Sequence, residues 1–382
     1  MRLWATLLLS LLLAACATPP ALAPPPQLFN DTAFAAPAQP VRTDQVFMLS
    51  DAMRDYMNGE IARQARSKSP RRALFDALYA KGQLKLEYDA ALTRNAAETF
   101  AARSGNCISL VIMTAALARE MGLEVQYQRV QIDENWSRSG QLYVASGHVN
   151  IILGRQKASG NTFDASAQMR IDFLPPKEVE GYASHAIDEN TIVAMYLNNR
   201  AAETLALGQV DTAYWWARAA ILQDPGFASA YNTLGVIFLR HGDLAQAQRA
   251  LAWAHERAPD NAAILSNLAQ ALDRLGRVAE SQALLQQLAR IEPVAPFHYF
   301  NLGQQALRDG DYAAASRMFA REIERDPYYH EFHFWLAQAY YRMGQLQLAD
   351  VQLGLALKNS STREEHNLYA AKLDRLRSHQ SR

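Results

Sequence analysis

The sequence predicts an α+β domain followed by an all-α repeat solenoid, and two patterns support this. An apolar segment from Cys107 to Met121 is followed by alternating apolar and polar residues from Leu123 to Gln128. A helix that is hydrophobic on all sides is a buried helix, and strict alternation indicates a strand packed on one face. From about Ala194, glycines and prolines each recur every 34 residues, a period typical of stacked helical repeats.

The N-terminal residues form a processing signal in this interpretation. Met1 and Arg2 precede an apolar run from Leu3 to Leu13, which is far shorter than the ~20 residues of a membrane-spanning helix. The following Leu13-Ala14-Ala15-Cys16 resembles the lipobox of bacterial lipoproteins. The resemblance implies that residues 1–15 are a cleaved signal peptide and that Cys16 is lipidated. An ordinary signal peptide with an incidental cysteine is the alternative.

The same resemblance implies a location in the bacterial cell envelope. Ala17, rather than aspartate, follows Cys16, which in that family implies an anchor on the periplasmic face of the outer membrane. Residues 16–42 are rich in proline and alanine and are expected to form an extended tether without a core. The basic and acidic residues balance, with 38 of each, so net charge favours no nucleic-acid partner.

The first globular unit is expected to span residues 43–190. Helices are predicted at 46–61, 70–82 and 92–103, before the apolar helix that Asn106 caps and Gly122 ends. Strands are predicted at 123–128, 142–153 and 161–165. A buried helix packed on an antiparallel sheet gives this unit its α+β class.

Cys107 is the candidate nucleophile. Lipidation of Cys16 would leave it without a disulfide partner, so it is either buried and inert or kept for its reactivity. Its place at a helix start favours the thiolate, since the helix N-terminus carries partial positive charge. His148, on a predicted strand, is the candidate base, and Asp164 on the next strand is expected to orient it. Two further aspartates, Asp172 and Asp188, rank lower because loop or linker is predicted there.

The residues around Cys107 carry a family resemblance. Ala96-Ala97-Glu98-Thr99-Phe100 and Arg103-Ser104-Gly105-Asn106-Cys107 resemble the approach to the nucleophile in bacterial transglutaminase-like, papain-like domains. There a cysteine begins the core helix, and a histidine and an aspartate follow on successive strands. The resemblance implies catalysis by Cys107, His148 and Asp164 on amide bonds, without a cofactor or metal. The backbone N–H of Cys107 is the expected oxyanion donor, and a second remains open among Gln126, Gln128, Trp136 and Asn150.

A neighbouring family gives an alternative. The strand His148-Val149-Asn150-Ile151-Ile152 is similar to the histidine strand of NlpC/P60-like cell-wall endopeptidases. Their cysteine stands in Asp-Cys-Ser-Gly, however, and Asn106-Cys107-Ile108-Ser109 departs from that pattern.

The C-terminal half resembles tetratricopeptide repeats. The periodic glycines are Gly208, Gly242, Gly276, Gly310 and Gly344, and the prolines are Pro225, Pro259, Pro293 and Pro327. Five repeats are predicted over residues 194–361, with a cap helix and tail at 362–382. The resemblance implies a concave peptide-binding groove that includes Asn198, Asn232, Gln270, Phe300, Gln304, Phe334 and Gln338. His330 and His333 have the spacing of a metal pair, but without supporting ligands they are expected at the surface.

Two functions follow from these patterns. The first is an envelope thiol enzyme, a protease, amidase or transglutaminase-type acyltransferase, whose repeats recruit a protein or peptide substrate. The sequence leaves open whether water or an amine accepts the acyl group, and water is favoured because it is always present. The second is a non-catalytic scaffold that binds envelope protein partners through its repeats.

Overall fold

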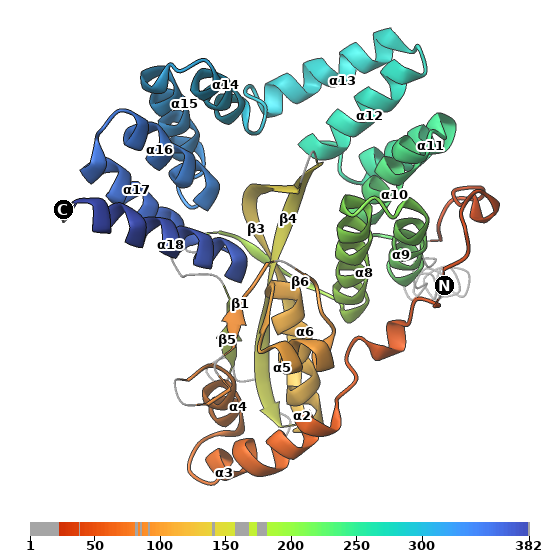
Figure 1. Ribbon diagram of the computed structural model, residues 1–382. Helices are drawn as coiled ribbons and strands as arrows, with labels where there is room; N and C mark the ends of the chain where they lie inside the picture. Colours follow the sequence, from red (N-terminus) through yellow and green to blue (C-terminus); the bar gives the residue numbers. More distant parts are fainter. Residues whose placement is uncertain are drawn as a thin grey trace, which may run out of the picture.

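The computed structural model describes residues 23–37, 39–80, 83–84, 86–90, 92–139, 142–156, 168–173 and 182–380. The predicted signal peptide and Cys16 therefore lie outside the described residues. Figure 1 shows an α+β unit, with an arc of paired helices that begins and ends beside it. None of the described helices is both long and apolar enough to cross a membrane.

The α+β unit begins with a series of short helices. After η1 (Asp31–Ala33) and η2 (Thr43–Gln45), a run of helix comprises α2 (Asp51–Tyr56), η3 (Met57–Ile61) and α3 (Ala62–Ala65). Next come α4 (Pro70–Tyr79) and α5 (Ala96–Ala102). A helix was predicted from residue 92, but Asn95 and Glu98 form a capping box that delays the start of α5 to Ala96.

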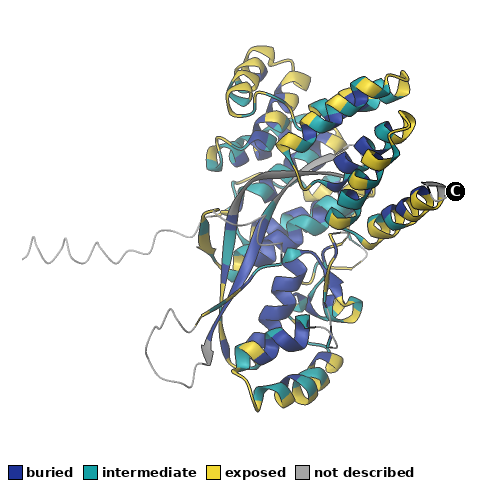
Figure 2. Cartoon of the chain, turned by 90° about the vertical axis from the view of Figure 1, so that its left-hand side faces the viewer, coloured by how far each residue is buried: buried dark blue, intermediate teal, exposed yellow. Residues whose placement is uncertain are grey.

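Helix α6 (Cys107–Glu120) forms the centre of this unit, as the apolar run predicts. Residues 108–118 are all buried, and Figure 2 shows the helix enclosed along most of its length. Asn106 caps its start by accepting from the N–H of Ser109 at 3.0 Å. Gly122, with φ of 72°, takes the left-handed conformation at its end.

An antiparallel sheet packs against α6. Its strands are β3 (Leu123–Ser139), β4 (Leu142–Gln156), β5 (Met169–Ile171) and β6 (Ser184–Ile187), in the order β5-β4-β3-β6. The two long strands overlap the predicted segments at 123–128 and 142–153, whereas the third predicted strand, 161–165, lies outside the described residues. A separate parallel pair, β1 (Glu87–Tyr88) and β2 (Ser104–Gly105), precedes Cys107.

The rest of the chain is an all-helical solenoid of antiparallel pairs. These are α8 (Glu189–Ala206) with α9 (Val210–Gln223), α10 (Ala228–His241) with α11 (Leu244–Arg257), α12 (Ala262–Arg274) with α13 (Val278–Ile291), α14 (His298–Arg308) with α15 (Tyr312–Arg325), and α16 (His330–Arg342) with α17 (Leu346–Asn359). Each periodic glycine has a φ between 72° and 95° at the turn within a pair, a conformation that glycine adopts without strain.

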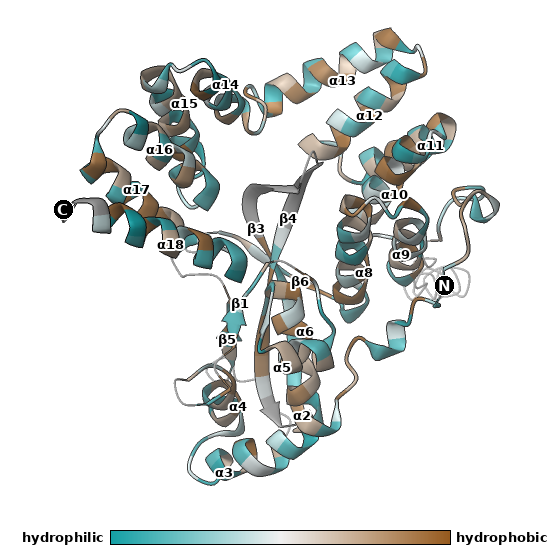
Figure 3. Cartoon of the chain, viewed as in Figure 1, coloured by the Kyte–Doolittle hydropathy of each residue, from teal (hydrophilic) through white to brown (hydrophobic). Residues whose placement is uncertain are grey.

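The last helix, α18 (Arg363–Gln380), is the predicted cap. Hydrophilic residues recur along it, as Figure 3 shows, while Tyr369, Leu373 and Leu376 are buried against the preceding helices. Solenoids need such a helix because the final repeat would otherwise expose its apolar face.

The predicted tether is wrong for part of its length. Leu28 and Phe34 are buried, at 1% and 5% exposure. The ring of Phe34 stacks on Tyr214 of α9 with centroids 4.0 Å apart, and the Tyr214 hydroxyl donates to Asp31 at 2.6 Å. Composition alone suggested a segment without a core, but two of its apolar side chains are buried, and Phe34 packs on helices α9 and α10 of the solenoid.

Candidate functional site: a Cys-His-Asp cluster beside the solenoid

Cys107 lies at the first position of α6 and is a free thiol. Between residues 104 and 118 it is the one residue that is not buried, so the thiol can meet a solute. The approach to it is tight, because a Cβ on Gly105 would lie 2.6 Å from the Cβ of Ser109. Glycine therefore allows the chain to turn closely into the helix that carries the thiol.

His148 faces this thiol from strand β4. The strand pairs with β3 through Val130 and with β5 through residues 151–153, so His148 stands in the interior of the sheet and is 4% exposed. Its Nε2 lies 2.6 Å from Oδ1 of Asp172. The Cys107 side chain lies close enough to the imidazole to raise its pKa. Since Asp172 occupies Nε2, Nδ1 is the ring nitrogen that remains for the thiol.

Asp172 reaches His148 because of the register between β4 and β5. Ile171 pairs with Ile151, so the next residue, Asp172, comes opposite Asn150 on the antiparallel neighbour. His148 and Asn150 are two residues apart and share one face of β4, which places both side chains near the carboxylate. Asn150 also donates from Nδ2 to Oδ2 of Asp172 at 3.3 Å, so two residues of one strand hold the carboxylate.

The aspartate beside His148 is thus one that the sequence ranked low. Asp172 was assigned to loop, but it directly follows the three-residue strand β5, which is too short for alternation to reveal. Asp164, the expected partner, lies outside the described residues. Asp188 precedes α8 at its N-cap position.

The surroundings of His148 favour its protonated form. Burial lowers its pKa, but the hydrogen bond to Asp172 and the contact with Cys107 outweigh burial and raise the pKa to about 9. A cationic imidazole next to a thiol at a helix N-terminus stabilises a thiolate through two nearby positive charges. This arrangement is chemically able to attack a carbonyl carbon and to return a proton to a leaving group.

The side chains considered as second oxyanion donors are partly engaged elsewhere. Asn150 donates to Asp172, and Gln128 accepts from the Ser184 hydroxyl at 3.4 Å. The side chain of Trp136 lies outside the described residues. At the start of α6 the N–H groups of Ser109 and Leu110 are both taken by Asn106.

The residues predicted to line a peptide groove differ in exposure. Phe300 is 1% exposed and packs against Phe319 and Phe332, so it belongs to the solenoid core rather than to a groove. Phe334 is partly buried and stacks on Tyr369 of the cap helix. The other five predicted groove residues also have partial or full exposure; they are Asn198, Asn232, Gln270, Gln304 and Gln338. Asn232 accepts from Asn267 of the next repeat at 3.0 Å.

His330 and His333 are buried, contrary to the expectation of surface positions. His330 Nδ1 lies 2.8 Å from the Tyr369 hydroxyl, and His333 bridges Gln352 and the carbonyl of Pro327. Each ring therefore has a structural partner, which spacing alone could not reveal. Among the described residues, no cluster of three or more histidine, cysteine or acidic side chains has the geometry to hold a metal ion.

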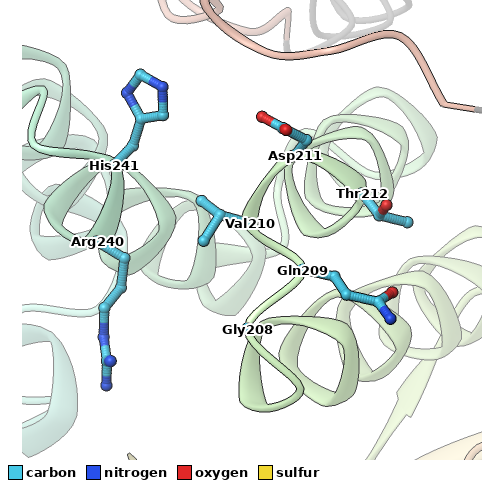
Figure 4. A pocket seen from close by; sticks show the side chains of 7 residues that line it. All are labelled: Gly208, Gln209, Val210, Asp211, Thr212, Arg240 and His241. Carbon is cyan, nitrogen blue, oxygen red and sulfur yellow. The ribbon is translucent and has the colours of Figure 1, made fainter.

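A shallow hollow lies elsewhere, on the solenoid. Residues 208–212 at the α8–α9 turn line one side, and Arg240 and His241 at the end of α10 line the other, as Figure 4 shows. Its lining includes none of the three residues of the Cys-His-Asp cluster.

Comparison with known proteins identifies the helical repeats. Residues 238–302 and 300–362 match two models described as tetratricopeptide repeat. The C-terminal region consists of tetratricopeptide repeats. Such repeats suggest a protein-interaction scaffold, and the matches do not extend to the α+β unit.

Several solved structures are similar to about half of the chain. YrrB, described as a repeat protein with an unusual peptide-binding site, is 19% identical and covers 47% of this chain and 92% of its own, with a TM-score of 0.26. A thermophilic repeat protein of Thermus thermophilus is 20% identical, covers 47% of this chain and 98% of its own, and has a TM-score of 0.29. For PilF of Pseudomonas aeruginosa the values are 18%, 51%, 88% and 0.29. The comparison with curated proteins found no match.

Proposed function

We propose that this protein is a thiol enzyme acting on amide bonds of a protein or peptide, with Cys107, His148 and Asp172 as its catalytic residues. The observation that carries the proposal is the convergence of these three side chains from α6, β4 and the end of β5. The thiol is partly exposed at a helix N-terminus, and the imidazole is held between thiol and carboxylate. A nucleophile, a base and a group that orients the base are the parts such chemistry needs.

The proposed reaction proceeds through an acyl-enzyme. The thiolate of Cys107 attacks the amide carbonyl carbon, and the tetrahedral oxyanion is stabilised by the backbone N–H of Cys107 at the start of α6. The C–N bond then breaks, and His148 gives its proton to the departing amine. In the second half, His148 takes a proton from water, and the resulting hydroxide equivalent releases the acid and restores the thiolate. An amine in place of water would give transamidation.

The repeats are proposed to recruit the substrate or a protein partner. The exposed amide of Gln270 can donate and accept hydrogen bonds with an extended backbone. The anchor on the outer membrane is likewise proposed, on the strength of the Leu13-Ala14-Ala15-Cys16 pattern and Ala17.

A non-catalytic scaffold is the second candidate function. It is favoured by the matches of residues 238–362 to tetratricopeptide repeats. These repeats form a large part of the chain, and binding a protein partner requires no catalytic residues. In this case the thiol would be a packing residue and the α+β unit a binding module.

Alkylation of Cys107 separates the two candidates. Rapid reaction with iodoacetamide at pH 6 is expected, since a protonated imidazole beside a thiol at a helix N-terminus favours the reactive thiolate. His148→Ala should slow that reaction at least about tenfold, because it removes the positive charge that stabilises the thiolate. His185→Ala is the matched control, as His185 is exposed on β6, a strand of the same sheet that pairs with β3 rather than with β4.

A thiol that reacts only after denaturation would refute the enzyme and leave the scaffold. If the thiol is reactive, a Cys107→Ala variant can be used to capture bound proteins from envelope extracts. Mass spectrometry of the captured proteins, with and without added wild-type enzyme, then identifies those that are cleaved or cross-linked.

A further inference from the structure

Thr93 is a fully buried residue that joins the start of α6 to the first helix of the solenoid. Its side chain and backbone are 0% exposed. Its hydroxyl oxygen accepts from Nδ2 of Asn106 at 2.7 Å, and Asn106 is the N-cap of the helix that Cys107 begins. We propose that Thr93, held by α8, is a positioning residue for the Cys107 thiol, so that the solenoid forms part of the reactive site.

Three residues of helix α8 form hydrogen bonds with Thr93. The N–H of Thr93 donates to Oε1 of Glu203 at 2.8 Å, and its carbonyl oxygen accepts from Arg200 at 3.1 Å. A third residue of α8, Asn199, donates to the Thr93 hydroxyl oxygen at 3.3 Å. These contacts use the backbone and side chain of a single residue and fix its orientation against the solenoid.

The contact continues from Thr93 into the first turn of α6. Because Nδ2 of Asn106 donates to Thr93, its Oδ1 must face the helix, where it accepts from the N–H of Ser109 at 3.0 Å and from the Ser109 hydroxyl at 2.9 Å. The Ser109 hydroxyl oxygen in turn accepts from the N–H of Arg94, the neighbour of Thr93, at 2.8 Å. The network is closed, so the amide of Asn106 has one orientation that satisfies all partners.

The consequence for the thiol follows from adjacency. Cys107 is bonded to Asn106, while His148 belongs to the sheet, so the distance between thiol and imidazole depends on where Asn106 is held. Loss of the Thr93 hydroxyl leaves Nδ2 of Asn106 without an acceptor in a buried place, which favours rotation of the amide and loosens the cap. The thiol then lies less consistently beside His148 and the first N–H groups of α6.

The test uses the full chain and the pH profile of iodoacetamide alkylation, and it rests on the proposed function. Thr93→Val keeps the shape of the side chain but removes the hydroxyl, and Thr93→Ser keeps the hydroxyl. We expect the Val variant to react about five times more slowly at pH 6, which corresponds to a lost cap of ~1 kcal/mol, with its midpoint at higher pH. The Ser variant should retain the wild-type profile.

Thr191→Val is the matched control, because the Thr191 hydroxyl on the same helix donates to Asp224 inside the solenoid rather than to the α+β unit. If Thr93→Val does not fold, Glu203→Gln takes its place, since it weakens the hold on Thr93 from a partly exposed position. It should move the midpoint in the same direction.

The outcomes distinguish this inference from the proposed function. A wild-type thiol that stays unreactive until denaturation contradicts the proposed function itself. A reactive wild type whose profile is unchanged in a folded Thr93→Val or Glu203→Gln variant contradicts only the role of Thr93. An equal shift in Thr191→Val would also overturn it, because any weakening of α8 would then have the same effect.

Discussion

At the scale of single residues, the surroundings of His148 matter most. Two acceptors face its ring from different elements, the Asp172 carboxylate after β5 and the Cys107 thiol at the start of α6. A buried imidazole without them would be neutral near pH 7, because burial disfavours charge. The Asp172 carboxylate reverses this preference by stabilising the protonated imidazole.

Asp172→Asn is predicted to lower the pKa of His148 and to change how stability depends on pH. In the wild type the folded pKa of about 9 lies above the unfolded value of about 6.5, so the pair stabilises the protein fully below pH 6.5. That stability declines from pH 6.5 and is lost above 9. The variant should lack the decline, with a difference on the order of 1 kcal/mol at pH 6.

Chemical denaturation at pH 6 and pH 10 measures the effect. Asp188→Asn is a suitable control, since Asp188 lies at the N-cap of α8 without a side-chain capping bond. Equal slopes of stability against pH for the wild type and Asp172→Asn would contradict the assigned charge of His148.

At the scale of elements, residues 28–34 are more buried than their composition predicts. Phe34 contacts Tyr214, Phe238 and His241, which lie on two helices of adjacent repeats. The backbone of Asn30 and the side chain of Asp31 add hydrogen bonds to Tyr214. Residues 28–34 thus form a strap across α9 and α10.

Phe34→Ala is predicted to release this strap while leaving the solenoid folded. Deleting a buried aromatic ring costs about 3–5 kcal/mol in a core. A short segment that is held by few contacts is expected to detach when it loses that much binding free energy. Limited proteolysis should then cut near residues 28–35 much faster, with Thr32→Ala, an exposed neighbour, as the control. Unchanged cleavage in Phe34→Ala would show that the strap does not depend on this ring.

At the scale of the whole molecule, the solenoid touches the α+β unit at both of its ends. Thr93 contacts α8, and three residues earlier the N–H of Ala90 donates to the carbonyl of Ser361 at 2.8 Å, just before α18. Both contacts lie in the segment that leads into α5 and the thiol helix. The two ends of the arc of repeats are therefore held to the α+β unit at Thr93 and at Ala90.

The cap helix α18 is predicted to stabilise the last repeat through a few buried side chains. Leu373 is 5% exposed and packs with Ala337 and Leu353, whereas Leu368 on the same helix is 46% exposed. Leu373→Ala should destabilise the C-terminal repeats by about 2–5 kcal/mol, and Leu368→Ala should change stability by less than about 0.5 kcal/mol. Hydrogen exchange of α16 and α17 reports the loss locally, and similar protection in both variants would contradict this role for α18.

Features that depend on residues close together along the chain could be predicted from the sequence. The 34-residue spacing of glycine and proline predicted the helix pairs and their turns, and the unbroken apolar run predicted the buried helix behind Cys107. His148 was found because a β-rich run surrounds it. These patterns involve only residues that are close in the sequence, so they can be recognised without knowledge of the fold.

Only the tertiary structure decided which distant residues meet. Asp172, which the sequence ranked low, faces His148 because the register of a three-residue strand places it there. Phe300 and His330 are buried because neighbouring repeats and α18 cover them, and Thr93 bonds to α8 across more than 100 residues of chain. Such pairings depend on strand register and helix packing, which are set by the free energy of the whole core rather than by local sequence.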